Sequence, residues 1–87
     1  MTNIDNATRA AEILRRVAQD FRAGSLDFAH KRMNGAGDFL ARAGETAFAE
    51  RITALGYMFD MPGEYPATVA DRIADEVDAL IAGGFIA

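Results

Sequence analysis

The side chains that could support acid–base chemistry lie close together in one short stretch of the chain. Ser25, Asp27 and His30 fall within six residues, and His30 is the only histidine. A nucleophilic site needs a hydroxyl or thiol, a base that activates it and a group that orients the base. Ser25 is better placed to cap a helix, and Asp27 and His30 have the spacing of any neighbours on one helical face. Even with Asp38 as a further member of the cluster, the sequence predicts no catalytic site.

Metal and nucleotide chemistry have little support. One histidine without any cysteine does not supply a zinc site, and no DxDxDG calcium loop is present. The triplet Gly35-Ala36-Gly37 is a bare GxG, with Leu40 where a dinucleotide fingerprint needs its next glycine. We expect no metal and no cofactor.

Acidic side chains are concentrated in the second half of the chain. Residues 1–43 carry seven basic and five acidic side chains, whereas residues 44–87 carry two basic and eight acidic ones, so the net charges are +2 and −6. Five carboxylates of this half form a predicted acidic face, with three of them spaced by four and three residues: Glu64, Asp71, Asp75, Glu76 and Asp78. A row of carboxylates on a helix can imitate a phosphate backbone and bind a basic partner. The alternative is that oppositely charged rims meet where helices of the two halves pack together.

The second candidate contact surface is the apolar turn, GYMFDMPGEYP, at residues 56–66. Its bulky side chains are Tyr57, Met58, Met61 and Tyr65. Methionine and tyrosine suit adaptable protein interfaces, but they also close the open end of a helical bundle by packing over it. Truncating a contact surface weakens binding, whereas truncating an end closure lowers stability first.

Residues 39–52, FLARAGETAFAERI, partly resemble a helix-turn-helix unit with Gly44 as the turn glycine. That motif usually has alanine four residues before the glycine, and apolar residues directly after it and six residues later. The chain instead has Leu40, Glu45 and Glu50 at these positions. Two glutamates at positions that must be buried, in the acidic half, disfavour direct binding to nucleic acid.

Four amphipathic helices are predicted to position these side chains. Apolar residues recur at steps of three and four over residues 5–23, 26–43, 46–59 and 66–83. Asn34 to Gly37 would weaken, kink or break the second helix, because each glycine costs about 1 kcal/mol inside a helix. The unbroken apolar phase favours one continuous helix. No period-two strand pattern is present, so the sequence predicts an all-α, antiparallel bundle in a single domain, residues 1–87.

Helix-end and core residues follow from the same pattern. Candidate N-terminal caps are Asp5 or Asn6, Ser25 and Thr46. Gly24, Gly44 and Gly83-Gly84 are candidate helix terminators. The predicted core comprises Leu14, Val17, Phe21, Leu40, Phe48, Ile52, Leu55, Phe59, Ile73, Val77 and Leu80.

The sequence favours a cytoplasmic, non-enzymatic protein that acts by binding another protein with a basic surface. It shows no basic stretch followed by an apolar run and no apolar window approaching about 18 residues, which disfavours secretion and membrane insertion. Absence of cysteine suits the cytoplasm. Small size, acidity and the lack of a catalytic motif fit the general profile of phage and mobile-element inhibitors, including anti-CRISPR proteins, although no residue matches a family motif.

Two alternatives remain open for the function. One is a homodimeric DNA-binding regulator, because a chain of 87 residues has a modest core and a second subunit would add stability. The other is a small assembly or structural component. Salt-dependent binding to duplex DNA would favour the first, and open-ended self-association would favour the second.

Overall fold

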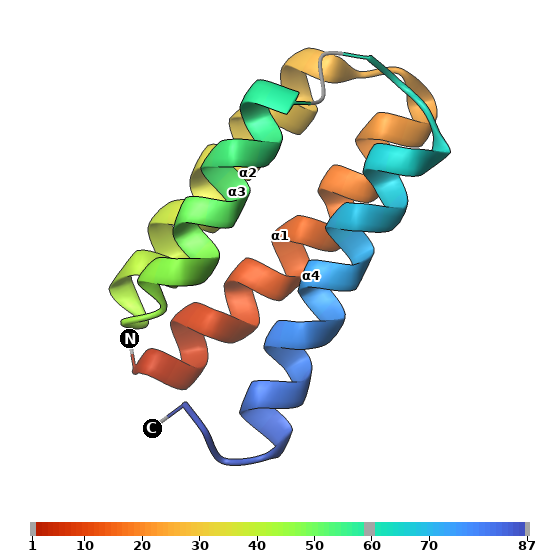
Figure 1. Cartoon of the computed structure of the whole chain (residues 1–87). Helices are drawn as coiled ribbons and strands as arrows, with labels where there is room; N and C mark the ends of the chain where they lie inside the picture. Colours follow the sequence, from red (N-terminus) through yellow and green to blue (C-terminus); the bar gives the residue numbers. More distant parts are fainter. Residues whose placement is uncertain (1, 59–60, 87) are drawn as a thin grey trace.

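Four α-helices joined by short connections make up the fold. The computed structural model describes residues 2–58 and 61–86, apart from the side chains of Tyr57 and Met58. The helices are α1 (Asn3–Ala23), α2 (Leu26–Arg42), α3 (Thr46–Met58) and α4 (Glu64–Ala82), and the described residues contain no strand. Successive helices run in opposite directions (Figure 1), in a body of 35 × 18 × 18 Å. The predicted all-α antiparallel bundle is therefore confirmed.

The helix ends follow the predicted glycines more closely than the predicted caps. Gly24 and Gly44 both adopt a left-handed conformation after α1 and α2, with φ of 76° and 82°. The cap of α1 is Thr2 and not Asp5 or Asn6. The Thr2 hydroxyl accepts a hydrogen bond from the Asp5 backbone at 3.1 Å, and the Asp5 carboxylate accepts one from the Thr2 backbone at 3.2 Å, which completes a capping box.

The caps of α2 and α3 also differ from the prediction. Ser25 occupies the cap position of α2, but its side chain makes no capping hydrogen bond. Thr46 is the first residue of α3 and therefore lies inside the helix instead of preceding it. Helix α2 therefore depends more on packing than on a side-chain cap.

The second helix passes through Asn34 to Gly37 without interruption. A Cβ atom on Gly37 would lie 3.9 Å from Cγ2 of Ile52, an ordinary van der Waals contact with α3. A Cβ atom on Gly35 would meet nothing within 4 Å. Glycine in a helix interior costs about 1 kcal/mol relative to alanine, and only at Gly37 does a close helix contact accompany that cost.

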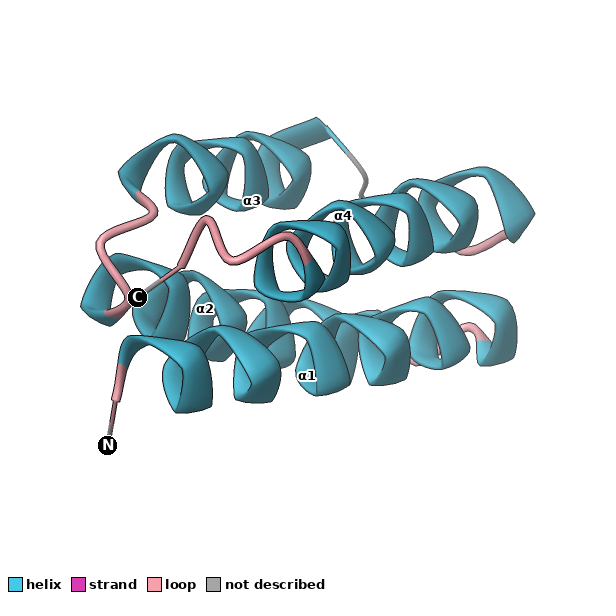
Figure 2. Ribbon diagram, turned by 90° about the horizontal axis from the view of Figure 1, so that it is seen from below, coloured by secondary structure: helices cyan, strands magenta, loops and turns pink. Residues whose placement is uncertain are grey.

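The core lies between two layers of helices. Figure 2 shows α1 and α2 side by side in one layer, with α4 over α1 and α3 over α2. Most of the predicted core residues are buried: Leu14, Val17, Phe21, Leu40, Ile52, Leu55, Ile73 and Val77. Phe48 and Leu80 are only partly buried, and Phe59 lies outside the described residues.

The helices α3 and α4 do not pack closely on each other, although they follow one another in the chain. Close helix contacts join α1 to α4, α1 to α2 and α2 to α3. The side chains of Arg51 and Glu76 form an ion pair across the space between α3 and α4, at 2.5 Å. Helix α3 is therefore held mainly by α2.

Candidate functional site

The five carboxylates of the predicted acidic face all form ion pairs within the chain. Arg15 on α1 contacts Asp75 at 2.9 Å and Asp78 at 2.6 Å. Arg22 lies about two turns further along α1 and contacts Glu64 and Asp71, both at 3.0 Å.

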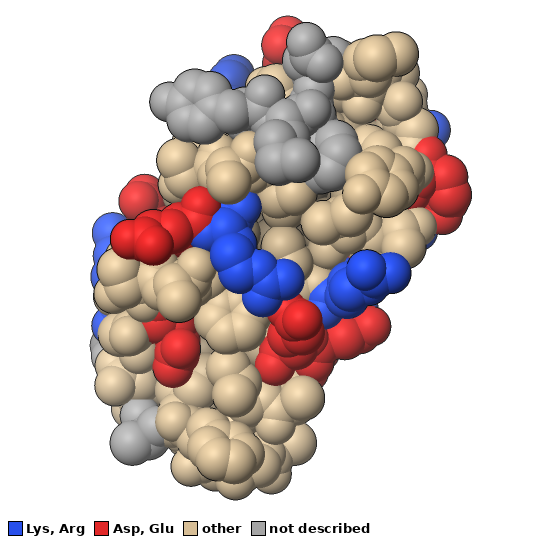
Figure 3. All heavy atoms as spheres, in the orientation of Figure 1, with Lys and Arg blue, Asp and Glu red and all other residues tan. Residues whose placement is uncertain are grey.

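Arginines of α1 therefore reach across to the row of carboxylates on α4, and Arg51 of α3 pairs with Glu76. Acidic and basic side chains lie next to one another on the face shown in Figure 3, without a broad patch of one sign. This arrangement is the alternative considered for the charge distribution, in which oppositely charged helix rims of the two halves of the chain meet. A partner would have to compete with these intramolecular arginines for the acidic face.

The Arg22–Glu64 pair has a measurable consequence for titration. Hydrogen bonds from Arg22 lower the pKa of Glu64 below its ordinary value of 4.5. A carboxylate with a lowered pKa in the folded state stabilises the protein above its unfolded-state pKa, and this contribution disappears as the pH falls through the folded-state pKa. The stabilisation by Glu64 is therefore fully present at neutral pH and is lost in the acid range below about pH 4.5.

We expect the Glu64 carboxyl resonance in an NMR pH titration to report a pKa below 4.5 in the unmodified protein. In Arg22→Gln the pKa should rise towards that value, because the guanidinium that favours the ionised form is gone. Arg51→Gln serves as the control, since Arg51 pairs with Glu76 and not with Glu64. Identical Glu64 titrations in the Arg22→Gln variant and the unmodified protein would contradict this assignment.

The two bulky side chains of the apolar turn that the structure describes, Met61 and Tyr65, are exposed, whereas Pro66 is buried. Met61 is 70% exposed and Tyr65 is 71% exposed, so neither packs over the open end of the bundle. The connection is tied to α1 by a backbone hydrogen bond, since the Gly63 N–H donates to the carbonyl of Phe21 at 3.1 Å. Tyr57 and Met58 are helical, and their side chains lie outside the description.

The acid–base cluster considered in the sequence does not come together. Asp27, His30 and Asp38 all lie on the uninterrupted helix α2. With a rise of about 1.5 Å per residue, Asp38 is about 12 Å along the helix axis from His30. The three side chains therefore cannot form one compact cluster.

Carboxylates of the described residues that form no ion pair lie elsewhere: Asp27 is in the first turn of α2, and others are at the α2–α3 side of the bundle. Among the described residues, Asp38, Glu45 and Glu50 form no ion pair. Asp38 and Glu50 line a groove of about 440 Å³ between the two helices, and Glu45 precedes α3 in the connection. Glu45 and Glu50 are also the acidic residues that break the helix-turn-helix pattern in the sequence.

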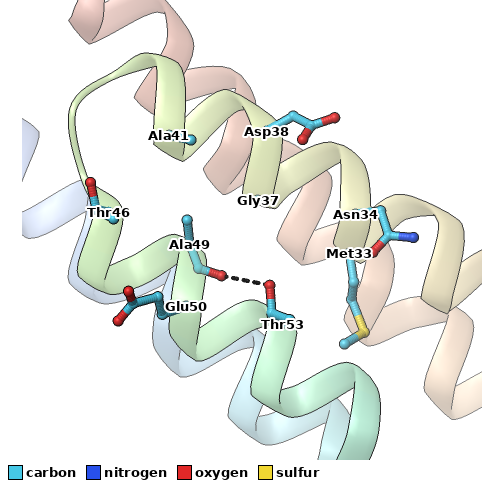
Figure 4. A pocket seen from close by; sticks show the side chains of 9 residues that line it. All are labelled: Met33, Asn34, Gly37, Asp38, Ala41, Thr46, Ala49, Glu50 and Thr53. Carbon is cyan, nitrogen blue, oxygen red and sulfur yellow. Dashed lines mark hydrogen bonds between the residues drawn. The ribbon is translucent and has the colours of Figure 1, made fainter.

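We call this feature the α2–α3 groove, and Figure 4 shows the residues that line it: Met33, Asn34, Gly37, Asp38, Ala41, Thr46, Ala49, Glu50 and Thr53. Gly37, Ala41 and Ala49 give it a floor of small residues. The Thr53 hydroxyl donates to the Ala49 carbonyl at 3.1 Å. A smaller hollow of about 230 Å³ shares Met33, Asn34 and Thr53 and extends the groove along α3 to Gly56.

Comparison of the chain with protein-family models, curated proteins and solved structures found no match. The described helices include none of the length and apolar character needed to cross a membrane. No group of three or more His, Asp or Glu side chains in the described part of the chain is placed to hold a metal ion.

Proposed function

We propose that this chain is a non-enzymatic protein-binding module, an inhibitor or adaptor, that engages a basic surface of another protein through the α2–α3 groove. The observation that carries the proposal is the position of Asp38 and Glu50, which line this groove from its two helices and form no ion pair. The paired carboxylates of the acidic face are less available, because Arg15, Arg22 and Arg51 already occupy them.

The shape of the groove suits a basic side chain. Lysine and arginine have long aliphatic stems that pack on apolar surface while the charged end stays at a polar edge. The small residues Gly37, Ala41 and Ala49 leave room for such a stem, and Asp38 and Glu50 supply acceptors for the charged end. An arginine could form a bidentate pair with either carboxylate.

The exposed residues Met61 and Tyr65 provide a second, apolar contact at another part of the surface. They belong to the α3–α4 connection and the start of α4, whereas the α2–α3 groove extends along the length of α3. Aromatic and methionine side chains are enriched in interface cores, where they contribute more energy than charged residues at the rim. We therefore expect the groove to select a basic partner and the exposed turn to add affinity.

Affinity capture from the organism that encodes the chain, followed by measurement on the purified pair, tests the proposal. We expect a partner protein whose contact surface is basic and whose Kd rises by about tenfold or more between 0.05 and 0.5 M NaCl, because salt screens exposed charge pairs. A salt-independent Kd, or an acidic contact surface on the partner, would contradict it. Binding to duplex DNA without a protein partner would favour the regulator instead, and concentration-dependent open-ended assembly would favour the structural component.

A further inference from the structure

A second groove, of about 400 Å³, runs between α1 and α2. Its lining residues on α1 are Arg9, Glu12, Ile13 and Arg16, and those on α2 are Phe28, Lys31, Arg32 and Gly35. Each set is spaced by three, one and three residues, which places it along one face of its helix. The two faces together form a continuous strip about two helical turns long, and we call it the α1–α2 groove.

The floor of the α1–α2 groove is apolar and open. Phe28 is 58% exposed, which is unusual for a large aromatic side chain, and Ile13 beside it is only partly buried. Gly35 contributes no side chain, and a Cβ atom there would meet nothing within 4 Å. A helix-interior glycine at this position destabilises α2 without serving an intramolecular contact, in contrast to Gly37.

The rim of the α1–α2 groove carries positive charge that the chain does not neutralise. Among the described residues, Arg16 and Lys31 form no ion pair. Arg32 pairs with Asp20 at 2.7 Å, and its guanidinium lies 5.6 Å from the centre of the Phe28 ring. The chain has a net charge of −4. The unpaired Arg16 and Lys31 beside an apolar floor nevertheless give this groove the opposite charge to the α2–α3 groove.

We propose that the α1–α2 groove binds a short amphipathic segment of a partner protein that bears acidic and apolar side chains. Arg16 and Lys31 match carboxylates by charge, and Phe28, Ile13 and the space at Gly35 accept apolar side chains. A nucleic acid fits less well, because its affinity comes mainly from phosphate contacts, which make no use of an apolar floor.

This inference goes beyond the proposed function, because it concerns a different face of α2. Helix α2 presents Phe28, Lys31 and Arg32 to the α1–α2 groove and Gly37, Asp38 and Ala41 to the α2–α3 groove. With 3.6 residues per turn, Phe28 and Arg32 point away from Gly37 and Ala41, whereas Lys31 and Asp38 lie on one side of the helix about two turns apart. One helix thus separates a basic groove from an acidic one, as an adaptor between two partners requires.

The test uses a synthetic amphipathic peptide of Glu and Leu, titrated into the full chain and followed by ¹H–¹⁵N NMR. We expect the largest shifts at Ile13, Phe28 and Gly35. The same peptide with Lys in place of Glu should cause no shifts at these residues. Shifts located elsewhere, equal binding of both peptides, or no binding at millimolar peptide would overturn the proposal.

Two variants separate the groove from a general charge effect. Arg16→Gln combined with Lys31→Gln should weaken binding of the acidic peptide by at least tenfold. Gly35→Leu should do the same by filling the groove, while its melting temperature stays equal or rises because leucine favours a helix. Unchanged peptide binding by Gly35→Leu would overturn the proposal, since that variant keeps every charge.

Asp38→Asn combined with Glu50→Gln should leave peptide binding at its original strength, so failure of the α2–α3 proposal would be distinguishable from failure of this one. Two further measurements test other occupants. Stronger binding of duplex DNA than of the acidic peptide, with shifts at Phe28 and Gly35, would overturn the proposal in favour of nucleic acid. The same shifts appearing with protein concentration alone would overturn it in favour of a second copy of the chain.

Discussion

Replacement of Phe21 by alanine is expected to lower the free energy of unfolding by about 3–5 kcal/mol, the usual cost of removing a buried aromatic side chain. Phe21 is 1% exposed and is among the largest fully buried side chains of the described core. It lies in the last turn of α1, the helix that packs against both α2 and α4, so the cavity would affect both contacts. A chain of 87 residues is expected to have a total stability of roughly 4–13 kcal/mol. The variant should therefore be largely unfolded at moderate urea concentration, as followed by circular dichroism.

Phe85→Ala is the matched control for this core substitution. It removes the same side chain from a position that is 77% exposed, close to the C-terminal end of α4. We expect a change below about 1 kcal/mol, because exposed substitutions usually have small effects. A loss below 1 kcal/mol in Phe21→Ala itself would mean that the apolar pattern of α1 does not mark the core.

The helices could be predicted because their signals are local. The spacing of Leu14, Val17 and Phe21 determines which side of α1 is buried, whatever that side packs against. Gly24 and Gly44 end α1 and α2 in the left-handed conformation that glycine adopts at low cost. The cap of α1 was missed because Thr2 precedes the apolar repeat, and only its pairing with Asp5 identifies it.

The continuity of α2 depends on tertiary contacts that a local pattern does not contain. The sequence alone weighs two helix-weakening glycines against an unbroken apolar phase. In the structure, Gly37 lies against Ile52 of α3, so a residue that weakens an isolated helix becomes a packing site in the bundle. Gly35 has no such contact, and α2 nevertheless continues through it.

The charged surfaces were harder to predict, because pairing across helices depends on side chains far apart in the sequence. The regular spacing of Asp75 and Asp78 predicts a shared face but gives no information about Arg15, which lies 60 residues from Asp75 in the chain. A carboxylate row that faces an arginine-bearing helix forms ion pairs with it. The unpaired carboxylates Asp38 and Glu50 show no comparable regular spacing, since they lie on different helices and line one groove only because α2 and α3 pack together.

The second large effect concerns binding of the partner protein. Asp38→Asn combined with Glu50→Gln should weaken partner binding by about tenfold or more, since the loss of one close charge pair at an interface commonly costs more than 1.4 kcal/mol, a factor of ten in Kd. Asp75→Asn combined with Asp78→Asn is the matched control, because it changes the net charge by the same two units from −4. Arg15 already pairs with both carboxylates of the control, so its Kd should stay within about twofold of the original. Isothermal titration calorimetry with the captured partner measures both values.

The two double variants distinguish a local contact from the overall charge of the chain. Long-range attraction depends on net charge, so equal weakening by both pairs of substitutions would indicate steering and contradict a contact in the α2–α3 groove. Weakening by Asp75→Asn with Asp78→Asn alone would show that the partner displaces Arg15 and binds the acidic face on α4. If neither pair changes the Kd while Met61→Ala or Tyr65→Ala raises it, the exposed turn is the contact surface. An unchanged melting temperature in those two variants would show that the weaker binding does not come from a loss of folding. Only a selective loss with Asp38→Asn and Glu50→Gln supports the groove, because it alone removes charges that no arginine of the described chain neutralises.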